Sequence, residues 1–146
     1  MRPMPFLLTA ALCLAPAVLG HAAPPAAHKA KPAANAAVVQ AAKSWLALMD
    51  ANKYAESWQA ASTSFQGAVT ADKWAATAQQ VRAQVGTLQT RSIASITPKV
   101  VASGPAAGQY EMVQYASKFS TAGAVHETVA LVKQGSVWKA AGYFIK

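Results

Sequence analysis

Cysteine is almost missing from this sequence, which has only Cys13 among its 146 residues. Cys13 lies within an apolar stretch and follows Leu12, whereas a cysteine that receives a lipid anchor follows a small residue at the end of such a stretch. We therefore expect no lipid anchor. Since the rest of the chain has no cysteine, its fold can contain no disulfide and must be held by an apolar core.

Acidic residues and histidines are also scarce, with five of the former and three of the latter. After residue 35 these side chains are Asp50, Glu56, Asp72, Glu111, His126 and Glu127. A metal site needs several such ligands at one point, so we expect no metal. No dinucleotide fingerprint or glycine-rich phosphate loop occurs either, so we expect no other cofactor. A Ser-His-acid hydrolase is equally unexpected, because no Gly-x-Ser-x-Gly motif occurs and the neighbours His126 and Glu127 would point to opposite faces of a strand.

Positive charge dominates, since 13 lysines and arginines give a formal net charge of +8. After residue 35 the basic residues are dispersed as Lys43, Lys53, Lys73, Arg82, Arg91, Lys99, Lys118, Lys133, Lys139 and Lys146. No run of them resembles a nucleic-acid-binding patch, and residues 104–108 lack the lysine and the helix of a phosphate-binding loop. A basic adaptor for anionic polymers of the cell envelope stays one interpretation, beside a charged surface that keeps the protein soluble.

The N-terminus has the three parts of a secretory signal peptide. Arg2 gives a positive start, residues 6–19 are almost entirely apolar, and Gly20-His21-Ala22 places small residues before a cleavage site. The apolar stretch is shorter than the roughly 20 residues that cross a bilayer. We therefore expect a signal peptide over residues 1–22, cleavage near Ala22, a periplasmic or secreted location and no membrane span after cleavage.

Residues 23–35 are rich in alanine, proline and lysine and have no large apolar side chain, which predicts a flexible linker. The remaining residues, 36–146, are enough for one domain. Its first half has apolar side chains three or four positions apart, which predicts three helices over residues 36–50, 53–61 and 71–85. Asn52 is expected to end the first helix and cap the second, and the third should lie between a Thr70 cap and Gly86.

After Gly86 the apolar period changes from 3.6 to 2, which predicts strands over residues 88–102, 109–119, 125–133 and 136–145. Pro98 is expected to cause an interruption, a bulge or a sheet edge. Gln134-Gly135 is expected to form a two-residue hairpin turn. Helices followed by antiparallel strands predict an α+β fold, in which three helices cover one face of a curved four-stranded sheet.

The last strand is expected to be apolar on both faces. One face should carry Trp138, Ala140, Gly142 and Phe144, and the other should carry Val137, Ala141, Tyr143 and Ile145. The second face of the sheet is therefore not expected to meet bulk water, and a symmetric homodimer through it is one hypothesis.

Two stretches of the sequence resemble a known family. They are SWLALMD at residues 44–50 with KYAESW at 53–58, and ETV at 127–129 with GSVWK at 135–139 and GYFIK at 142–146. In their order and spacing they resemble the small exported bacterial proteins grouped as domain of unknown function 4019. The resemblance implies a cone-shaped fold of the nuclear-transport-factor-two-like, or cystatin-like, class, and it implies no particular activity.

Similar cones serve as isomerases, dehydratases, binding modules and scaffolds, so function must be argued from the site. The scarcity of titratable groups favours a non-enzymatic module of the cell envelope that binds a small apolar ligand or an envelope protein. The alternative is a cofactor-free isomerase or lyase with His126 or Asp50 as its base. Side chains that could line a ligand pocket are Tyr54, Trp58, Tyr115 and Tyr143.

Overall fold

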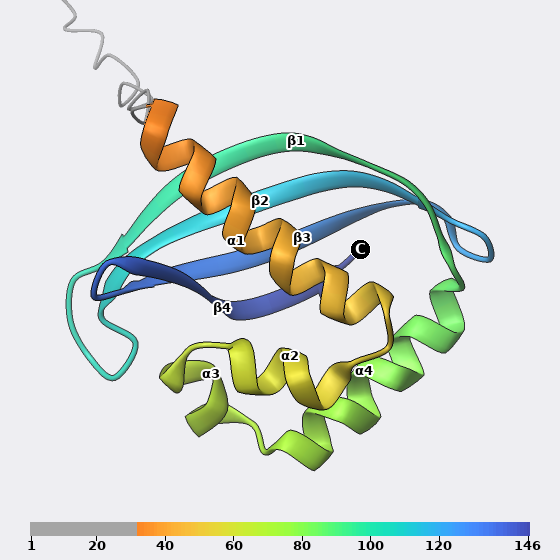
Figure 1. The fold of residues 1–146 in the computed structure, drawn as a ribbon, viewed down its shortest axis with the longest axis horizontal. Helices are drawn as coiled ribbons and strands as arrows, with labels where there is room; N and C mark the ends of the chain where they lie inside the picture. The colour runs from red at the N-terminus through yellow and green to blue at the C-terminus, as the bar shows by residue number, and fades with distance from the viewer. Residues whose placement is uncertain (1–31) are drawn as a thin grey trace, which may run out of the picture.

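The computed structural model describes residues 32–146, so the expected signal peptide and most of the expected linker lie outside the described residues. Four helices come first: α1 (Pro32–Asp50), α2 (Tyr54–Ala60), α3 (Thr63–Ala68) and α4 (Ala71–Val85). Four strands follow: β1 (Leu88–Val101), β2 (Gly108–Phe119), β3 (Gly123–Gln134) and β4 (Val137–Ile145). The predicted α+β fold is confirmed (Figure 1).

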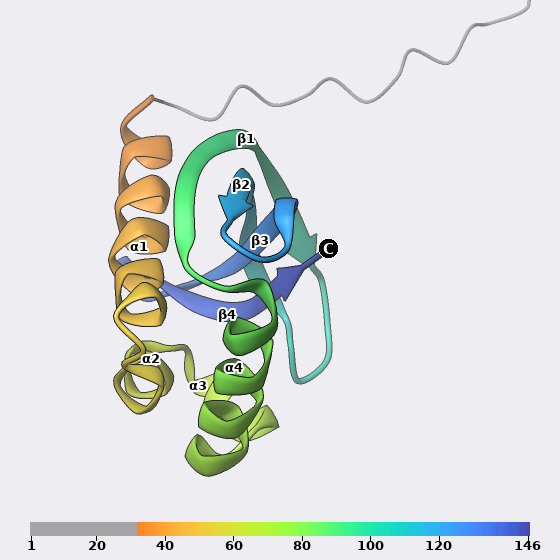
Figure 2. The same ribbon diagram turned by 90° about the vertical axis from the view of Figure 1, so that its right-hand side faces the viewer.

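The strands form one antiparallel sheet in the order β1-β2-β3-β4, so each strand pairs with its neighbour in the chain. The sheet is strongly curved, and α1 runs across its concave side (Figures 1 and 2). Helix α2 packs on α1 and on α4, and α3 packs between α2 and β4. No helix between residues 32 and 146 is both long and apolar enough to cross a membrane.

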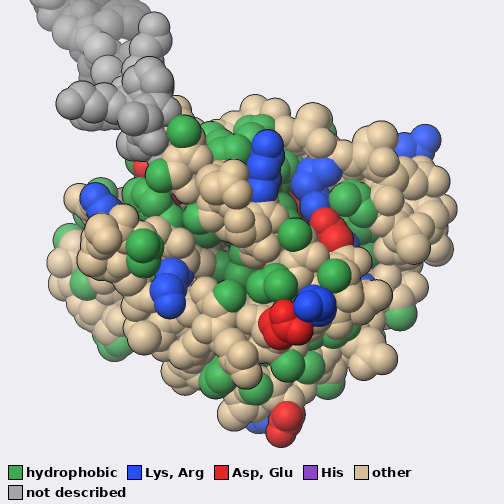
Figure 3. Space-filling view, viewed as in Figure 1, with side chains coloured by type: hydrophobic (Ala, Val, Ile, Leu, Met, Phe, Trp, Pro, Cys, Tyr) green, Lys and Arg blue, Asp and Glu red, His purple; other side chains and the backbone are tan. Residues whose placement is uncertain are grey.

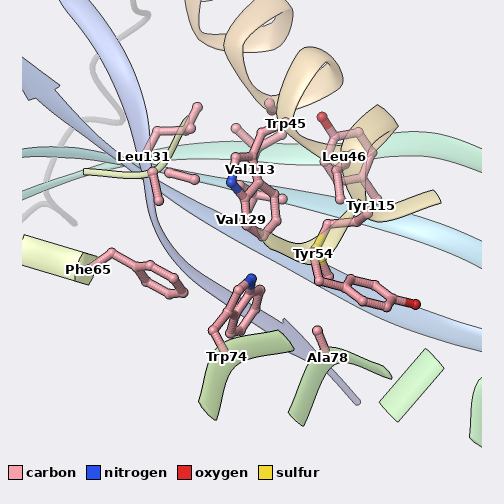
Figure 4. Close-up of a cluster of buried hydrophobic side chains, with 14 of the residues drawn as sticks. Trp45, Leu46, Tyr54, Phe65, Trp74, Ala78, Val113, Tyr115, Val129 and Leu131 are labelled. Atoms are coloured by element: carbon pink, nitrogen blue, oxygen red, sulfur yellow. The ribbon is translucent and has the colours of Figure 1, made fainter. Parts of the chain in front are cut away.

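The core lies between the helices and the concave side of the sheet. From α1 it receives the predicted stripe of Val38, Ala42, Trp45 and Met49, all at most 4% exposed. From the other elements it receives Phe65, Trp74 and Ala78 of the helices and Val113, Tyr115, Val129 and Leu131 of the central strands (Figure 4). The switch of apolar period at Gly86 therefore marks the boundary between the two layers of this core.

The helical half differs from the prediction in three places. Helix α1 begins at Pro32, within the expected linker, because proline fits the first turn of a helix, where its missing N–H is not needed. Helix α3 was missed, since it has six residues, one of them glycine, and its signal is the Ser62 cap that accepts from the Phe65 N–H. Asn52 ends α1 in a left-handed conformation with φ 59°, but its side chain does not cap α2.

The predicted boundaries of the third expected helix, here α4, are confirmed. Thr70 Oγ1 accepts from the Lys73 N–H, and Gly86 follows the helix with φ 84°. A Cβ at Gly86 would clash with the Ser120 hydroxyl oxygen, so glycine is required here for space as well as for conformation. This close approach joins the end of α4 to the turn between β2 and β3.

The strands also refine the prediction. Of the three outcomes named for Pro98, the sheet edge is the observed one, because β1 is an edge strand and its register shifts lie elsewhere. The hairpin turn between β3 and β4 is Gly135-Ser136, one residue later than predicted, with Gly135 at φ 59°.

Strand β4 contains a bulge that the sequence did not predict. Leu131 pairs with Ala140 but Ala130 pairs with Gly142, so Ala141 is the extra residue. The expected faces were therefore wrong after this point. Trp138 and Ala140 share the concave side with Tyr143, whereas Gly142 and Phe144 lie on the outer side.

Candidate functional site

A cavity of about 880 Å³ opens where α1 and α4 end and β1 begins. Its apolar wall comes from Met49, Ala83 and Leu88, and its polar wall includes Asp50 and Arg82. The remaining lining residues are Asn52, Tyr54, Gln79, Gly86 and Thr87. The cavity is thus built from the last turns of two helices, and its mixed lining suits a small molecule with both an apolar and a polar part.

Glu127 is the centre of a polar cluster behind this cavity. It lies on β3, at an inward position, and is fully buried. Arg91 donates to both of its carboxylate oxygens, at 2.6 and 2.9 Å, and the hydroxyls of Ser117 and Tyr143 donate to it as well. Burial alone would raise the pKa of Glu127, but these hydrogen bonds and the charge of Arg91 outweigh burial and lower that pKa.

Arg91 connects the buried cluster to the cavity. Its Nη1 donates to Asp50 Oδ2 at 2.6 Å, and its Nη2 donates to Asp50 Oδ1 at 3.1 Å. Burial opposes the charge of Arg91, but the hydrogen bonds to Asp50 and Glu127 raise its pKa, so it stays protonated. Arg82 of α4 donates to Asp50 Oδ1 at 2.9 Å from the other side. Charges of alternating sign therefore run from the cavity wall into the sheet as Arg82, Asp50, Arg91 and Glu127.

We expect acid to destabilise the protein through Glu127. Because folding lowers the pKa of Glu127 from its ordinary value of 4.5, its contribution is complete above that pH and is lost as the pH falls through the lower pKa of the folded state. Melting temperatures of the wild type and of Glu127→Gln, measured from about pH 7 to about pH 3, test this. The wild type should lose more stability in acid than the variant, and equal losses in both proteins would contradict this role of Glu127.

Arg82 is the cavity residue with the most unused hydrogen-bonding capacity. Its side chain is 7% exposed, and its guanidinium carbon lies 5.3 Å from the ring centre of Phe119 and 5.8 Å from that of Tyr143. A guanidinium has five N–H donors. Within residues 32–146, Arg82 makes one hydrogen bond, from Nη2 to Asp50, and its buried Nε has no partner. An acceptor oxygen on a ligand in the cavity would bond to the Nη groups, whereas Nε is enclosed by protein and lies out of its reach.

Two comparisons with known proteins give a match, one to a protein family and one to a solved structure. A family model described as "Protein of unknown function (DUF4019)" matches residues 41–143. The chain belongs to the DUF4019 family. The solved structure of Aln2 from a Streptomyces species is similar to this DUF4019 chain with a TM-score of 0.50 and 12% identity, over 80% of this chain and 91% of that one. The similarity confirms the nuclear-transport-factor-two-like fold class and nothing further. No curated protein has a matching sequence.

The site residues proposed from the sequence lie at four places in this DUF4019 domain. Asp50 and Tyr54 line the cavity, and Tyr143 and Tyr115 lie in the core behind it. Trp58 does not line the cavity, and its Nε1 donates to the carbonyl of Val69 at 2.7 Å. His126 is exposed on the outer side of the sheet, so the structure does not bring the two candidate bases, His126 and Asp50, together.

Sequence reasoning missed Arg82, Arg91, Ser117 and Glu127, since it counted both arginines of the DUF4019 domain among dispersed surface charges and Glu127 among scattered acids. Arg82 follows Ala78 by four residues, which places it on the buried stripe of α4. Glu127 precedes Val129 by two residues, at an inward position of β3. Because a buried charge needs a partner, these two positions were the available signals. No group of three or more His, Cys, Asp or Glu side chains converges in the described part of the chain.

Proposed function

We propose that this protein is an exported, non-enzymatic binding module that holds a small organic anion in the cavity beside Arg82. The observation that carries the proposal is the buried guanidinium of Arg82, which lines the cavity and uses one of its five donors. The signal-peptide pattern of residues 1–22 supports a periplasmic or secreted location, and so a role in the cell envelope.

The arrangement of the carboxylates favours binding over catalysis. A general base needs a lone pair that reaches the substrate. The oxygens of Glu127 are buried and accept from three side chains, and both oxygens of Asp50 accept from arginines. His126 lies on the opposite side of the sheet from the cavity cluster. The isomerase or lyase interpretation would have to use Asp50, whose two oxygens already accept three hydrogen bonds from Arg82 and Arg91.

The chemistry of the wall indicates the class of ligand. A carboxylate matches the fork of N–H donors on a guanidinium and would form charge-assisted hydrogen bonds with Arg82. The charge of Asp50 is balanced by Arg82 and Arg91, so it opposes such an anion less than a free aspartate would. Ala83 and Leu88, which are exposed and half-buried, would contact the apolar part of the ligand.

Native mass spectrometry of the protein isolated from its source cells would test for a natural ligand. We expect a species heavier than the polypeptide from Ala23 onward, with the extra mass released when the protein is denatured. The released molecule should carry an acidic group, because an anion is what Arg82 would retain. A released cation, or a neutral molecule without an acceptor oxygen, would contradict the proposed ligand class.

Calorimetric titration with octanoate, 1-octanol and octylammonium separates the contribution of charge from that of the apolar chain. We expect octanoate to bind at least about tenfold more tightly than octanol, since hydrogen bonds to a charged group contribute about 1.5–3 kcal/mol. Ala83→Phe should fill part of the cavity and remove this binding. Ala76→Phe is the matched control, because Ala76 is also an exposed alanine of α4 but does not line the cavity. Equal affinity for octylammonium, or no effect of Ala83→Phe, would refute the site.

A further inference from the structure

The outer side of the sheet carries four lysines and one histidine but, in the described part of the chain, no acidic side chain. Strand pairing places Lys99 beside Tyr110, and Tyr110 beside Val132, which pairs with Lys139. Because side chains alternate between the two faces along a strand, Lys118 lies on the same side as Tyr110, and His126 of the next strand lies on the same side as Val132. Reciprocal backbone hydrogen bonds pair His126 with Lys146. We call this side, with Lys99, Lys118, His126, Lys139 and Lys146, the outer face.

The acids of the described chain all lie elsewhere. Glu111 and Glu127 occupy inward positions of β2 and β3, and Asp50, Glu56 and Asp72 belong to the helices. On the helix side, acidic and basic side chains lie close together (Figure 3). The positive charge of the outer face is therefore not compensated within that face.

Apolar side chains stand among these lysines. Phe144 is 52% exposed and Val137 is 51% exposed, and both lie on the outer face. A Cβ at Gly142 would lie 3.2 Å from the Phe144 ring, so the ring covers this glycine beside Ala130. The bulge at Ala141 is what turns Phe144 to this side, away from the core. The outer face thus combines exposed apolar groups with uncompensated positive charge.

We propose that the outer face docks on the surface of an anionic lipid bilayer. Lysines near such a surface are attracted to its headgroups, and an exposed phenylalanine can enter the boundary between headgroups and acyl chains. The outer face has no arginine, which is the residue suited to binding one phosphate through two hydrogen bonds. Its lysines therefore fit a surface of many anionic headgroups better than a single specific phosphate.

Two other occupants fit the outer face less well. A second copy of the chain would place its four lysines against the same four lysines, and like charges would oppose the contact. A soluble polyanion would satisfy the lysines but would leave Phe144 and Val137 in water. Both remain measurable outcomes of the experiment below.

Vesicle co-sedimentation of the chain without residues 1–22 tests the proposal. We expect binding to vesicles in which about a third of the phosphatidylcholine is replaced by phosphatidylglycerol, weak binding to pure phosphatidylcholine, and loss of binding at high salt.

Lys118→Gln with Lys146→Gln should weaken binding about 25-fold, since each lysine contributes about fivefold. Lys43→Gln with Lys73→Gln is the matched control, because it removes the same charge from exposed positions of α1 and α4. Phe144→Ser should weaken binding about threefold without changing the charge.

Three results would overturn the proposal. Equal losses in the two lysine pairs would assign the binding to net charge and not to the outer face. Binding of soluble polyglutamate as tightly as phosphatidylglycerol vesicles, with Phe144→Ser unchanged, would identify a polyanion surface. A dimer by light scattering that Phe144→Ser dissociates would identify a second copy as the occupant. Melting curves of all variants would confirm that they are folded.

Discussion

Arg91→Leu is expected to lower the free energy of unfolding by about 3–5 kcal/mol at neutral pH, the usual cost of removing one partner of a buried ion pair. Arg91 is 13% exposed and holds the carboxylates of Glu127 and Asp50 with four hydrogen bonds. Leucine would leave Glu127 fully buried beside only Ser117 and Tyr143. Denaturant unfolding at neutral pH measures this loss, and a change below about 1 kcal/mol would contradict the role assigned to Arg91.

The pH dependence of Arg91→Leu should have the opposite sign to that of the wild type. Without the arginine, burial should raise the pKa of Glu127 above its ordinary value, because burial is the largest influence on this group. A group with a raised pKa stabilises the fold below its unfolded pKa and loses that effect as the pH rises. The variant should therefore become less stable from mildly acid to neutral pH. The double variant Arg91→Leu/Glu127→Leu is the control, since it should recover stability and lack this dependence.

Trp74→Ala is the second change with a large expected effect, also about 3–5 kcal/mol, as for other truncations of a large core side chain. The Trp74 ring meets the Phe65 ring edge-on at 4.9 Å and lies 6.0 Å from the Trp45 ring. Its Nε1 also donates to the buried hydroxyl of Ser57 at 2.9 Å. The substitution removes both the packing between three helices and a buried hydrogen bond.

Thermal and denaturant unfolding of Trp74→Ala would measure this effect. Ser57→Ala is the matched control, because it removes the acceptor of Trp74 but keeps the ring, and it should cost about 1–3 kcal/mol, the usual penalty for a buried donor that loses its partner. If Trp74→Ala melts close to the wild type, the assignment of Trp74 to the core between α1, α3 and α4 is wrong.

The elements that sequence reasoning placed well are those whose periodic pattern is long. The stripe of α1 and the caps of α4 were read from local spacing, because a helix of more than three turns repeats its buried face several times. Helix α3 has too few residues to show a period. The bulge at Ala141 shifts the faces of β4 without any change in composition, so alternation alone could not locate it.

The candidate site was harder to predict because its charges meet across the chain. Arg91 lies 36 residues from Glu127 and 41 from Asp50, and no local pattern connects them. Asp50 and Tyr54 were proposed from residue type and do line the cavity. His126 was proposed because it is the only histidine after residue 35, which describes composition and says nothing of geometry.

The order β1-β2-β3-β4 has a consequence for how this chain can reach its fold. Each strand pairs with the strand made just before it, so the sheet can grow by one hairpin closure after another. No strand has to be inserted between two others that are already paired. The sheet can thus form from contacts between strands that are neighbours in the sequence. The contacts between residues far apart in the sequence, such as Asp50 of α1 with Arg91 of β1, form when the helices pack on the sheet.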